Sequence, residues 1–237
     1  MNSYLIATIK SWNIENCEKL ISKFPDCKFS LISDPKKFTK DLLESIKPDY
    51  VFLPHWSWII PKDIYEDYNC VVFHMTDLPF GRGGSPLQNL LIRGIYQTKI
   101  SAIKVCADLD AGPVYIKEPF DISKGSADEI LRRASDVVFK HMIPRFLTED
   151  LTPCEQTGEI VTFKRRTPDQ SEIPEGLTQK QLYDYIRMLD GEGYPAAFMR
   201  LGTGRMLFTD ATYEDNMVMS RARFVPSDKE KLKDDMQ

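Results

Sequence analysis

Short apolar runs alternate with amphipathic segments along the first half of the chain. The runs are rich in β-branched and aromatic residues, as strands are, and they predict strands at 4–9, 28–32, 50–53, 70–74 and 99–105. The segments between the first three runs predict helices at 16–24 and from Asp34-Pro35 to about Ile46, where proline suits the first turn. This β-α-β-α-β order predicts a mostly parallel sheet with right-handed crossovers, and therefore an α/β fold.

The pattern then predicts a β-hairpin, and after residue 150 the alternation of strands and helices gives way to a loop-rich region. A run at 114–120 is expected to pair with 99–105, and a Ser126…Glu129 capping box opens an amphipathic helix. The rest is loop-rich, with a helix at 178–189 and short antiparallel strands at 196–201, 205–210 and 217–224. We therefore predict a main domain at 1–150, a small α+β appendage at 151–226 and a disordered charged tail at 227–237.

Composition narrows the class of protein. The chain is 42% hydrophobic with a net charge of −4, which argues weakly against a broad basic surface for nucleic acid. Five scattered cysteines without Cys/His ligand spacing fit a reducing compartment and predict no metal site. Without a secretory signal or a long apolar segment, we expect a cytoplasmic protein that has no membrane contact.

One stretch, 70–88, combines a strand, a histidine and a glycine-rich loop: CVVFHMTDLPFGRGGSPLQ. His74 ends the strand, and Pro86 opens the next helix after the loop. Ligands of open α/β sheets bind beyond the carboxyl ends of strands, and glycines let a ligand approach the backbone. His74 is therefore a candidate for chemistry, although a structural histidine beside a turn-forming loop is the competing interpretation.

Two further segments are expected at this edge of the sheet. The loop 54–61, PHWSWIIP, is either one wall of a pocket for a flat ligand or a cover over the core. Asp110 lies in the turn after the fifth predicted strand, from which its carboxylate could orient His74 and stabilise the imidazolium. Asp108 and Asp77 compete for that role and are expected to be solvated turn residues.

These residues carry a family resemblance. His74, then Leu-Pro, Arg82-Gly83 and Pro86, followed by the Asp-Ala-Gly-Pro turn at 110–113, resembles the paired motifs of folate-dependent formyltransferases. The resemblance covers roughly residues 1 to 150. Two later segments, KRRTPD at 164–169 and GYPAAF at 193–198, are similar to C-terminal portions of the sugar N-formyltransferases.

The resemblance implies an enzyme with a Rossmann-like formyltransferase fold that uses 10-formyltetrahydrofolate as co-substrate. It implies that His74 and Asp110 are catalytic. The folate site would be formed by Trp58, Ile59, Ile60, Ala107, Asp108 and Leu109. The amine substrate would be bound by Thr76, Arg82, Gly83, Gly84, Ser85 and Lys104.

One position departs from the family pattern. The family has an asparagine two residues before the histidine, and Val72 stands there in this chain. The asparagine amide would help to bind the oxyanion, and losing one such donor can cost about 3 kcal/mol. Ser101 or Lys104 could replace it, the oxyanion could rest on His74 alone, or the enzyme could be inactive.

The resemblance favours a UDP- or dTDP-linked 4-amino-4,6-dideoxy sugar as acceptor, in surface-glycan or nonulosonic-acid biosynthesis. The tRNA enzymes of the family carry a longer C-terminal barrel with a basic face, whereas this chain has a short appendage and is acidic. Arg165 and Arg166 could meet a diphosphate or serve as structural ion-pair partners.

Other functions stay open at this point. They are formylation of aminoacyl-tRNA or of a carrier-bound amino acid, hydrolysis of 10-formyltetrahydrofolate, and folate or nucleotide binding without turnover. The hairpins of the appendage could also serve a homodimer contact, although no residue requires it.

Overall fold

The structure is a computed structural model that describes residues 2–226, and its contacts divide the chain into two units. Unit 1 comprises the described parts of Met1–Pro86, Gln97–Asp121 and Leu131–Phe163, and unit 2 those of Leu87–Tyr96, Ile122–Ile130 and Lys164–Gln237. This division differs from the predicted single boundary after residue 150, because two earlier segments group with the C-terminal part. The predicted tail at 227–237 lies outside the described residues.

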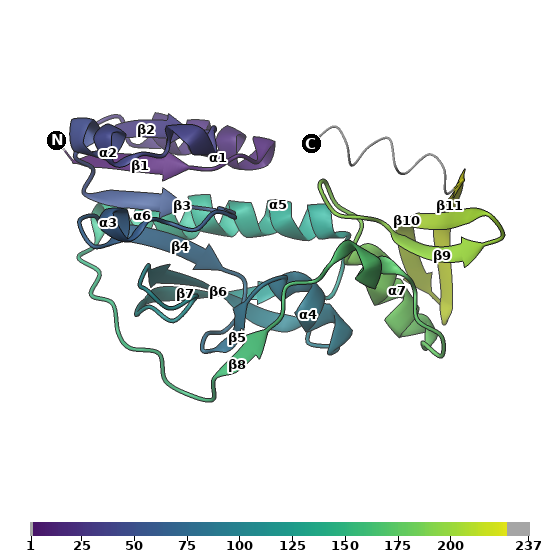
Figure 1. Cartoon of the computed structure of the whole chain (residues 1–237). Helices are drawn as coiled ribbons and strands as arrows, with labels where there is room; N and C mark the ends of the chain where they lie inside the picture. The colour runs from purple at the N-terminus through teal and green to yellow at the C-terminus, as the bar shows by residue number, and fades with distance from the viewer. Residues whose placement is uncertain (1, 227–237) are drawn as a thin grey trace. The chain divides into compact units, whose positions relative to one another are not determined.

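Unit 1 is built on a six-stranded sheet of order β2-β1-β3-β4-β6-β7 (Figure 1). The strands are β1 (Ser3–Ala7), β2 (Lys28–Ile32), β3 (Tyr50–Leu53), β4 (Cys70–His74), β6 (Gln97–Lys104) and β7 (Val114–Asp121). The first four strands in this order are parallel, β6 is antiparallel to β4, and β7 is antiparallel to β6. The predicted α/β class with a mostly parallel sheet and a terminal hairpin is confirmed.

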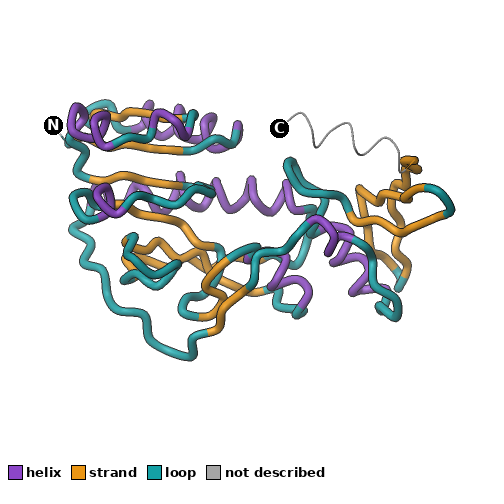
Figure 2. Tube along the Cα trace, viewed as in Figure 1, coloured by secondary structure: helices purple, strands orange, loops and turns teal. Residues whose placement is uncertain are grey.

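The helices of unit 1 are more numerous than predicted, and α1 begins earlier than the predicted residue 16 (Figure 2). They are α1 (Ser11–Lys23), α2 (Lys40–Ile46), α3 (Lys62–Tyr65), α6 (Ile143–Thr148) and most of α5 (Ala127–Val137), which continues into a π-helical turn at Val138–Met142. The helix predicted from Asp34 is split, because Asp34 caps a 3-10 turn at Pro35–Lys37 and Thr39 then caps α2. No helix in residues 2–226 is both long enough and apolar enough to cross a membrane.

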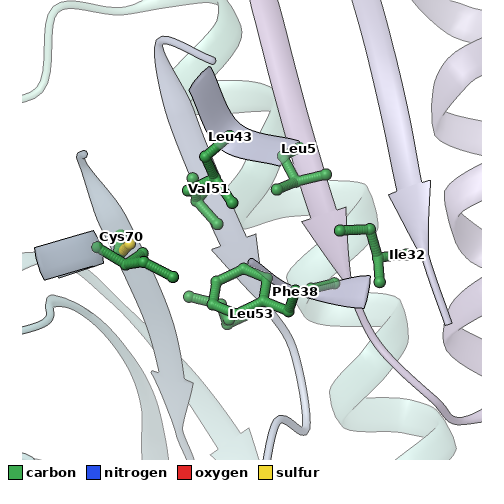
Figure 3. Close-up of a cluster of buried hydrophobic side chains, with 9 residues drawn as sticks. Leu5, Ile32, Phe38, Leu43, Val51, Leu53 and Cys70 are labelled. Atoms are coloured by element: carbon green, nitrogen blue, oxygen red, sulfur yellow. The ribbon is translucent and has the colours of Figure 1, made fainter. Parts of the chain in front are cut away.

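Alternation along the strands gives the sheet of unit 1 two apolar faces. Leu5, Val51 and Leu53 share one face, where they pack with Phe38 and with Leu43 of α2 (Figure 3). Residues of the other parity form an aromatic layer in which the Phe52 ring lies 5.3 Å from that of Phe146 in α6. Each fully buried side chain of this size contributes about 1.5–3 kcal/mol, so these two layers fix the strand ends that carry the site.

Two short strands, β5 (Phe80–Gly83) and β8 (Val161–Phe163), pair in parallel within unit 1. Both segments were predicted as loops. The glycine-rich segment is extended because its backbone forms hydrogen bonds with β8. Local sequence does not reveal such a distant partner.

Unit 2 contains α4 (Pro86–Ile92) from Leu87 onward, α7 (Gln179–Arg187) and a three-stranded antiparallel sheet. The sheet order is β11-β10-β9, with β9 (Ala197–Leu201), β10 (Gly204–Glu214) and β11 (Met217–Pro226). The predicted helix and three strands are confirmed. A dimer contact through these hairpins stays a prediction.

A buried arginine ties α7 to the loop before α5 in unit 2. Arg187 is 1% exposed, and its Nε donates to Asp184 Oδ1 at 2.7 Å. Its Nη1 donates to the carbonyl oxygens of Ile122 and Gly125 at 3.0 and 2.9 Å. A buried charge is tolerated only when it is paired and hydrogen-bonded, so this arginine is a structural group.

Arg187→Met is expected to lower the free energy of unfolding by about 3 kcal/mol, because Asp184 loses its buried cation and keeps only Lys180 and Tyr96 as partners. Urea denaturation measures the loss. The matched control is Arg200→Met, since Arg200 pairs with Glu172 at 3.0 Å in an exposed position. Such surface pairs contribute about 1 kcal/mol or less, so equal losses in the two variants would contradict the structural role of Arg187.

Candidate active site

The two residues predicted to be catalytic lie next to each other in unit 1. His74 ends β4 and is 9% exposed, and its Nδ1 is 3.5 Å from Oδ2 of Asp110. A carboxylate beside an imidazole orients the ring and favours its protonated form. The geometry therefore suits the chemistry proposed for the pair.

The path that brings Asp110 to His74 differs from the one expected. Because β6 runs antiparallel to β4, Ser101 pairs with His74, and Lys104 at the end of β6 pairs with Val71 near the start of β4. The following turn must therefore run back along β4 to deliver Asp110, whose backbone has a left-handed φ of 53°. The two residues were expected to meet because both follow the carboxyl ends of parallel strands. That reason was wrong, since β6 is antiparallel to β4, but the predicted proximity of the two side chains is present.

The glycine-rich strand β5 holds both members of the pair through its backbone. His74 Nε2 donates to the carbonyl oxygen of Gly81 at 2.7 Å, and the Gly83 N–H donates to Asp110 Oδ2 at 2.9 Å. Gly83 has a φ of 105°, and a Cβ there would lie 2.4 Å from the Phe163 carbonyl oxygen, so only glycine fits.

These bonds distinguish the two ring nitrogens of His74. A carbonyl oxygen can only accept, so Nε2 carries a proton and is committed to Gly81. The 3.5 Å distance from Nδ1 to Asp110 exceeds the usual 2.7–3.2 Å of an N–H···O hydrogen bond. Nδ1 is therefore the nitrogen that remains for the reacting groups.

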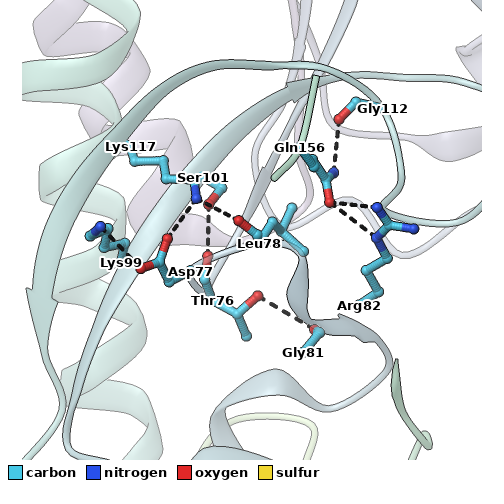
Figure 4. Close-up of polar contacts among 10 residues, drawn as sticks. All are labelled: Thr76, Asp77, Leu78, Gly81, Arg82, Lys99, Ser101, Gly112, Lys117 and Gln156. Atoms are coloured by element: carbon cyan, nitrogen blue, oxygen red, sulfur yellow. Dashed lines mark hydrogen bonds and ion pairs between the residues drawn. The ribbon is translucent and has the colours of Figure 1, made fainter. Parts of the chain in front are cut away.

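Arg82 and Gln156 connect the two loops that carry the pair (Figure 4). Gln156 Oε1 accepts from Arg82 Nε at 3.0 Å and from Nη2 at 2.8 Å. Its Nε2 donates to the carbonyl oxygens of Asp110 and Gly112 at 2.9 and 2.8 Å. No pattern in the sequence marks Gln156, which lies in a polar segment outside both motifs.

Comparison with known proteins decides the family. Residues 168–225 match the family model for the methionyl-tRNA formyltransferase C-terminal domain. A solved structure described as methionyl-tRNA formyltransferase from Clostridium thermocellum is 46% identical, with a TM-score of 0.93 over 96% of this chain and 100% of that one. The chain belongs to the formyltransferase family. Members of this family are enzymes that transfer formyl groups, and the family uses folate.

More distant relatives match a smaller part of the chain at lower identity. The methionyl-tRNA formyltransferase of Rickettsia felis is 28% identical over 140 residues, which are 57% of this chain and 46% of that protein. The chain thus spans about half the length of the curated relatives it matches.

Two further solved structures share the fold. A 4-N formyltransferase from Francisella tularensis has a TM-score of 0.68 at 15% identity, over 95% of this chain and 96% of that one. HypX from Aquifex aeolicus in complex with tetrahydrofolic acid has a TM-score of 0.71 at 17% identity, over 89% of this chain and 38% of that one.

Thr76, one of the residues predicted to bind the substrate, makes hydrogen bonds within the segment that follows His74. Thr76 is fully buried, its Oγ1 lies 3.4 Å from the Gly81 carbonyl oxygen, and its own carbonyl oxygen accepts from Ser101 Oγ at 2.7 Å (Figure 4). Ser101 is therefore committed to the loop and does not replace the missing asparagine. Lys104 lies opposite Val71, away from His74, so the structure does not bring it to the pair.

The next loop residue is held by two lysines. Asp77 forms ion pairs with Lys99 at 3.0 Å and Lys117 at 2.6 Å, and Lys117 also donates to the Leu78 carbonyl oxygen (Figure 4). Burial raises the pKa of Asp77, but the hydrogen bonds from Lys117 and Lys99 outweigh it and leave the pKa below its usual value. Asp77 thus anchors the loop and does not compete with Asp110 for His74.

Val72, at the position of the family asparagine, packs against the apolar cluster of Figure 3. Its side chain therefore belongs to the core. Neither of the two replacements named from the sequence supplies the missing amide, because Ser101 bonds the Thr76 carbonyl oxygen and Lys104 lies opposite Val71.

The predicted folate loops present large apolar side chains to solvent. Ile59 is 95% exposed, Leu109 is 74% exposed and Trp58 is 44% exposed. Ile60 packs against the apolar cluster instead, and Ala107 and Asp108 are exposed. Exposed apolar side chains next to polar turns are what a flat pteridine ring would cover, so these loops fit the co-substrate.

A second histidine and a small cavity lie on the other face of β4. The cavity is lined by Pro54, His55, Phe73, Met75, Ile100, Ala134 and Val138. Phe73 alternates with His74 along β4 and so points away from its face. Asn13 Nδ2 donates to His55 Nδ1 at 3.1 Å. Burial is the main cause that lowers the pKa of His55 to about 4, and the positive charge of Lys10 is the second cause.

His55 is expected to make the fold sensitive to acid. Above pH 6.5 the ring is neutral in the folded and unfolded states, and it adds no pH dependence. As the pH falls from 6.5 toward 4, only the unfolded chain binds the proton, which destabilises the fold by up to about 3 kcal/mol.

The test compares unfolding free energies at pH 7 and pH 4. His55→Asn, which tolerates the left-handed φ of 53° at this position, should lose less stability than the wild type between the two values. His141→Asn is the control, because His141 is exposed. Identical pH dependence in wild type and His55→Asn would contradict the assignment.

Proposed function

We propose that the chain is an N-formyltransferase that moves the formyl group of 10-formyltetrahydrofolate to the primary amine of a nucleotide-linked sugar. The sugar is a UDP- or dTDP-linked 4-amino-4,6-dideoxy sugar, and the reaction is cytoplasmic. The observation that carries the proposal is the His74–Asp110 pair, 3.5 Å apart and fixed on both sides by the backbone of β5.

The pair has the groups that formyl transfer requires. 10-Formyltetrahydrofolate supplies the formyl group, an amide-like carbonyl that an amine can attack. His74, protonated beside Asp110, donates a hydrogen bond from Nδ1 to the oxygen that becomes negative. The Asp110 carboxylate takes the proton that the attacking amine loses and passes it to N10 of the folate as the bond between the formyl carbon and N10 breaks, so that neutral tetrahydrofolate leaves. Positioned acid-base groups of this kind contribute about 10²- to 10⁴-fold to a rate.

The charges of unit 2 favour a small anionic substrate over a polyanion. Arg166 donates to the Gln170 carbonyl oxygen and, at 3.1 Å, to the Tyr185 hydroxyl. Arg221 pairs with Asp210 at 3.4 Å, as Arg200 does with Glu172. The arginines paired with carboxylates carry no net positive charge with their partners, so they add little to the local positive field that a phosphate backbone requires.

The contacts of Arg166 with the Gln170 carbonyl oxygen and the Tyr185 hydroxyl support a structural role for this residue. Arg165 is exposed, and a diphosphate contact at this side chain stays part of the proposal.

Formylation of methionyl-tRNA is the second candidate. It is favoured by the name of the 46% identical solved structure and of the curated relatives.

One panel of acceptors separates these functions. The purified chain and 10-formyltetrahydrofolate are incubated with UDP- and dTDP-linked 4-amino sugars, with methionyl-tRNA, or with no acceptor, and products are followed by mass. We expect a gain of one formyl group on a sugar. A formyl group on methionyl-tRNA alone would establish the second candidate, and formate release without acceptor would indicate a hydrolase. The absence of all three products would reject the proposed activity.

A further inference from the structure

We propose that Gln156 is a positioning residue, which holds the His74–Asp110 pair in register from outside both sequence motifs. The proposal rests on the proposed function of the pair. Gln156 is half-buried in the segment 152–160, most of which is exposed. Its side chain therefore turns inward from a surface loop.

The loop that carries Gln156 is anchored on both sides of it. Cys154 and Val114 exchange backbone hydrogen bonds of 2.7 and 2.9 Å, two residues before Gln156. After it, the Val161 N–H donates to the Pro79 carbonyl oxygen at 3.3 Å. These anchors fix the backbone from which the side chain reaches into the site.

The amide of Gln156 uses its full hydrogen-bonding capacity. Two bonds from Arg82 reach Oε1, and two bonds leave Nε2 for the carbonyl oxygens of Asp110 and Gly112, all between 2.8 and 3.0 Å. A guanidinium can only donate and a carbonyl can only accept, so the amide has one possible orientation. The flipped amide would face like partners at all four bonds.

The contacts close a ring around the pair (Figure 4 shows its Arg82–Gln156–Gly112 side). His74 binds Gly81, Arg82 follows in the chain and binds Gln156, Gln156 binds the backbone of Asp110, and Asp110 faces His74. Asp110 has a left-handed φ of 53°, which sets the direction of its carboxylate. Gln156 holds the carbonyl oxygens on both sides of Ala111 and so keeps this turn in place.

Gln156→Glu separates positioning from stability. The new carboxylate keeps the bonds from Arg82 and gains an ion pair, but it places an oxygen against the carbonyl oxygens of Asp110 and Gly112. We expect kcat for formyl transfer to fall about 100-fold, the effect of a small displacement of reacting groups, with KM values and melting temperature near those of the wild type. Thr157→Glu is the matched control, because it adds the same charge at an exposed neighbouring position.

A second readout is independent of the acceptor and of turnover. The chain has three histidines, and imidazole ¹⁵N spectra of His74 can be assigned by its loss in His74→Gln. Gln156→Leu and Gln156→Glu should shift the ring signals of His74 while those of His55 and His141 stay in place. This result would support the inference even if no acceptor of the panel is formylated, an outcome that would reject only the proposed function.

Three results would overturn the inference. The first is wild-type kcat in Gln156→Glu, and the second is an equal loss of kcat in Thr157→Glu. The third is a parallel loss of kcat and melting temperature with unchanged His74 ring signals, which would mean that Gln156 only stabilises the loop.

Discussion

His74→Gln is expected to reduce formyl transfer by about 10³- to 10⁴-fold while the chain stays folded. The glutamine amide nitrogen can take the place of Nε2 and keep the bond to the Gly81 carbonyl oxygen, which is 2.7 Å long in the native site. No donor then remains at the position of Nδ1, the ring nitrogen to which we assign the contact with the formyl oxygen. The measurement is kcat with saturating co-substrate, together with a melting temperature.

His74→Asn is the matched variant, because its shorter amide places a donor near Nδ1 and none near Nε2. If Nδ1 faces the reacting carbonyl, His74→Asn should keep about tenfold more activity than His74→Gln, in spite of losing the Gly81 bond. The opposite order would assign the chemistry to Nε2. Quenching of tryptophan fluorescence by folate should be similar in both variants, which separates catalysis from co-substrate binding.

The His74–Asp110 pair could be proposed from the sequence because each residue lies in a short motif. His74 ends an apolar run that local pattern identifies as a strand, and Asp110 lies in a turn rich in glycine and proline. Their approach could be expected only because β4 and β6 are neighbours. The direction of β6 was not accessible, since an apolar run does not show whether it runs parallel or antiparallel to its neighbour.

Long-range partners explain what the sequence did not show. The glycine-rich segment is extended because it pairs with β8, about eighty positions later in the chain. The four hydrogen bonds of the Gln156 amide likewise depend on atoms of Arg82 and of the turn 110–112. A polar residue in a surface segment has no periodicity that would mark it. Ser101 shows the opposite error. It lies at a suitable position to replace the family asparagine, but its hydroxyl already donates to the Thr76 carbonyl oxygen.

Asp110→Asn is the second variant with a large expected effect. Asparagine tolerates the left-handed φ of 53°, its Oδ1 can accept from the Gly83 N–H, and the bond from Gln156 reaches the backbone, which the substitution leaves intact. The fold and the loop should therefore persist. The carboxylate that favours protonated His74 and takes the amine proton is lost, so we expect kcat to fall by about 10²- to 10⁴-fold.

Glu159→Gln is the matched control for this loss. It removes one negative charge from an exposed position and should leave kcat unchanged. A comparable fall of kcat in Glu159→Gln would mean that the effect of Asp110→Asn comes from the change in net charge and not from the position of the carboxylate beside His74.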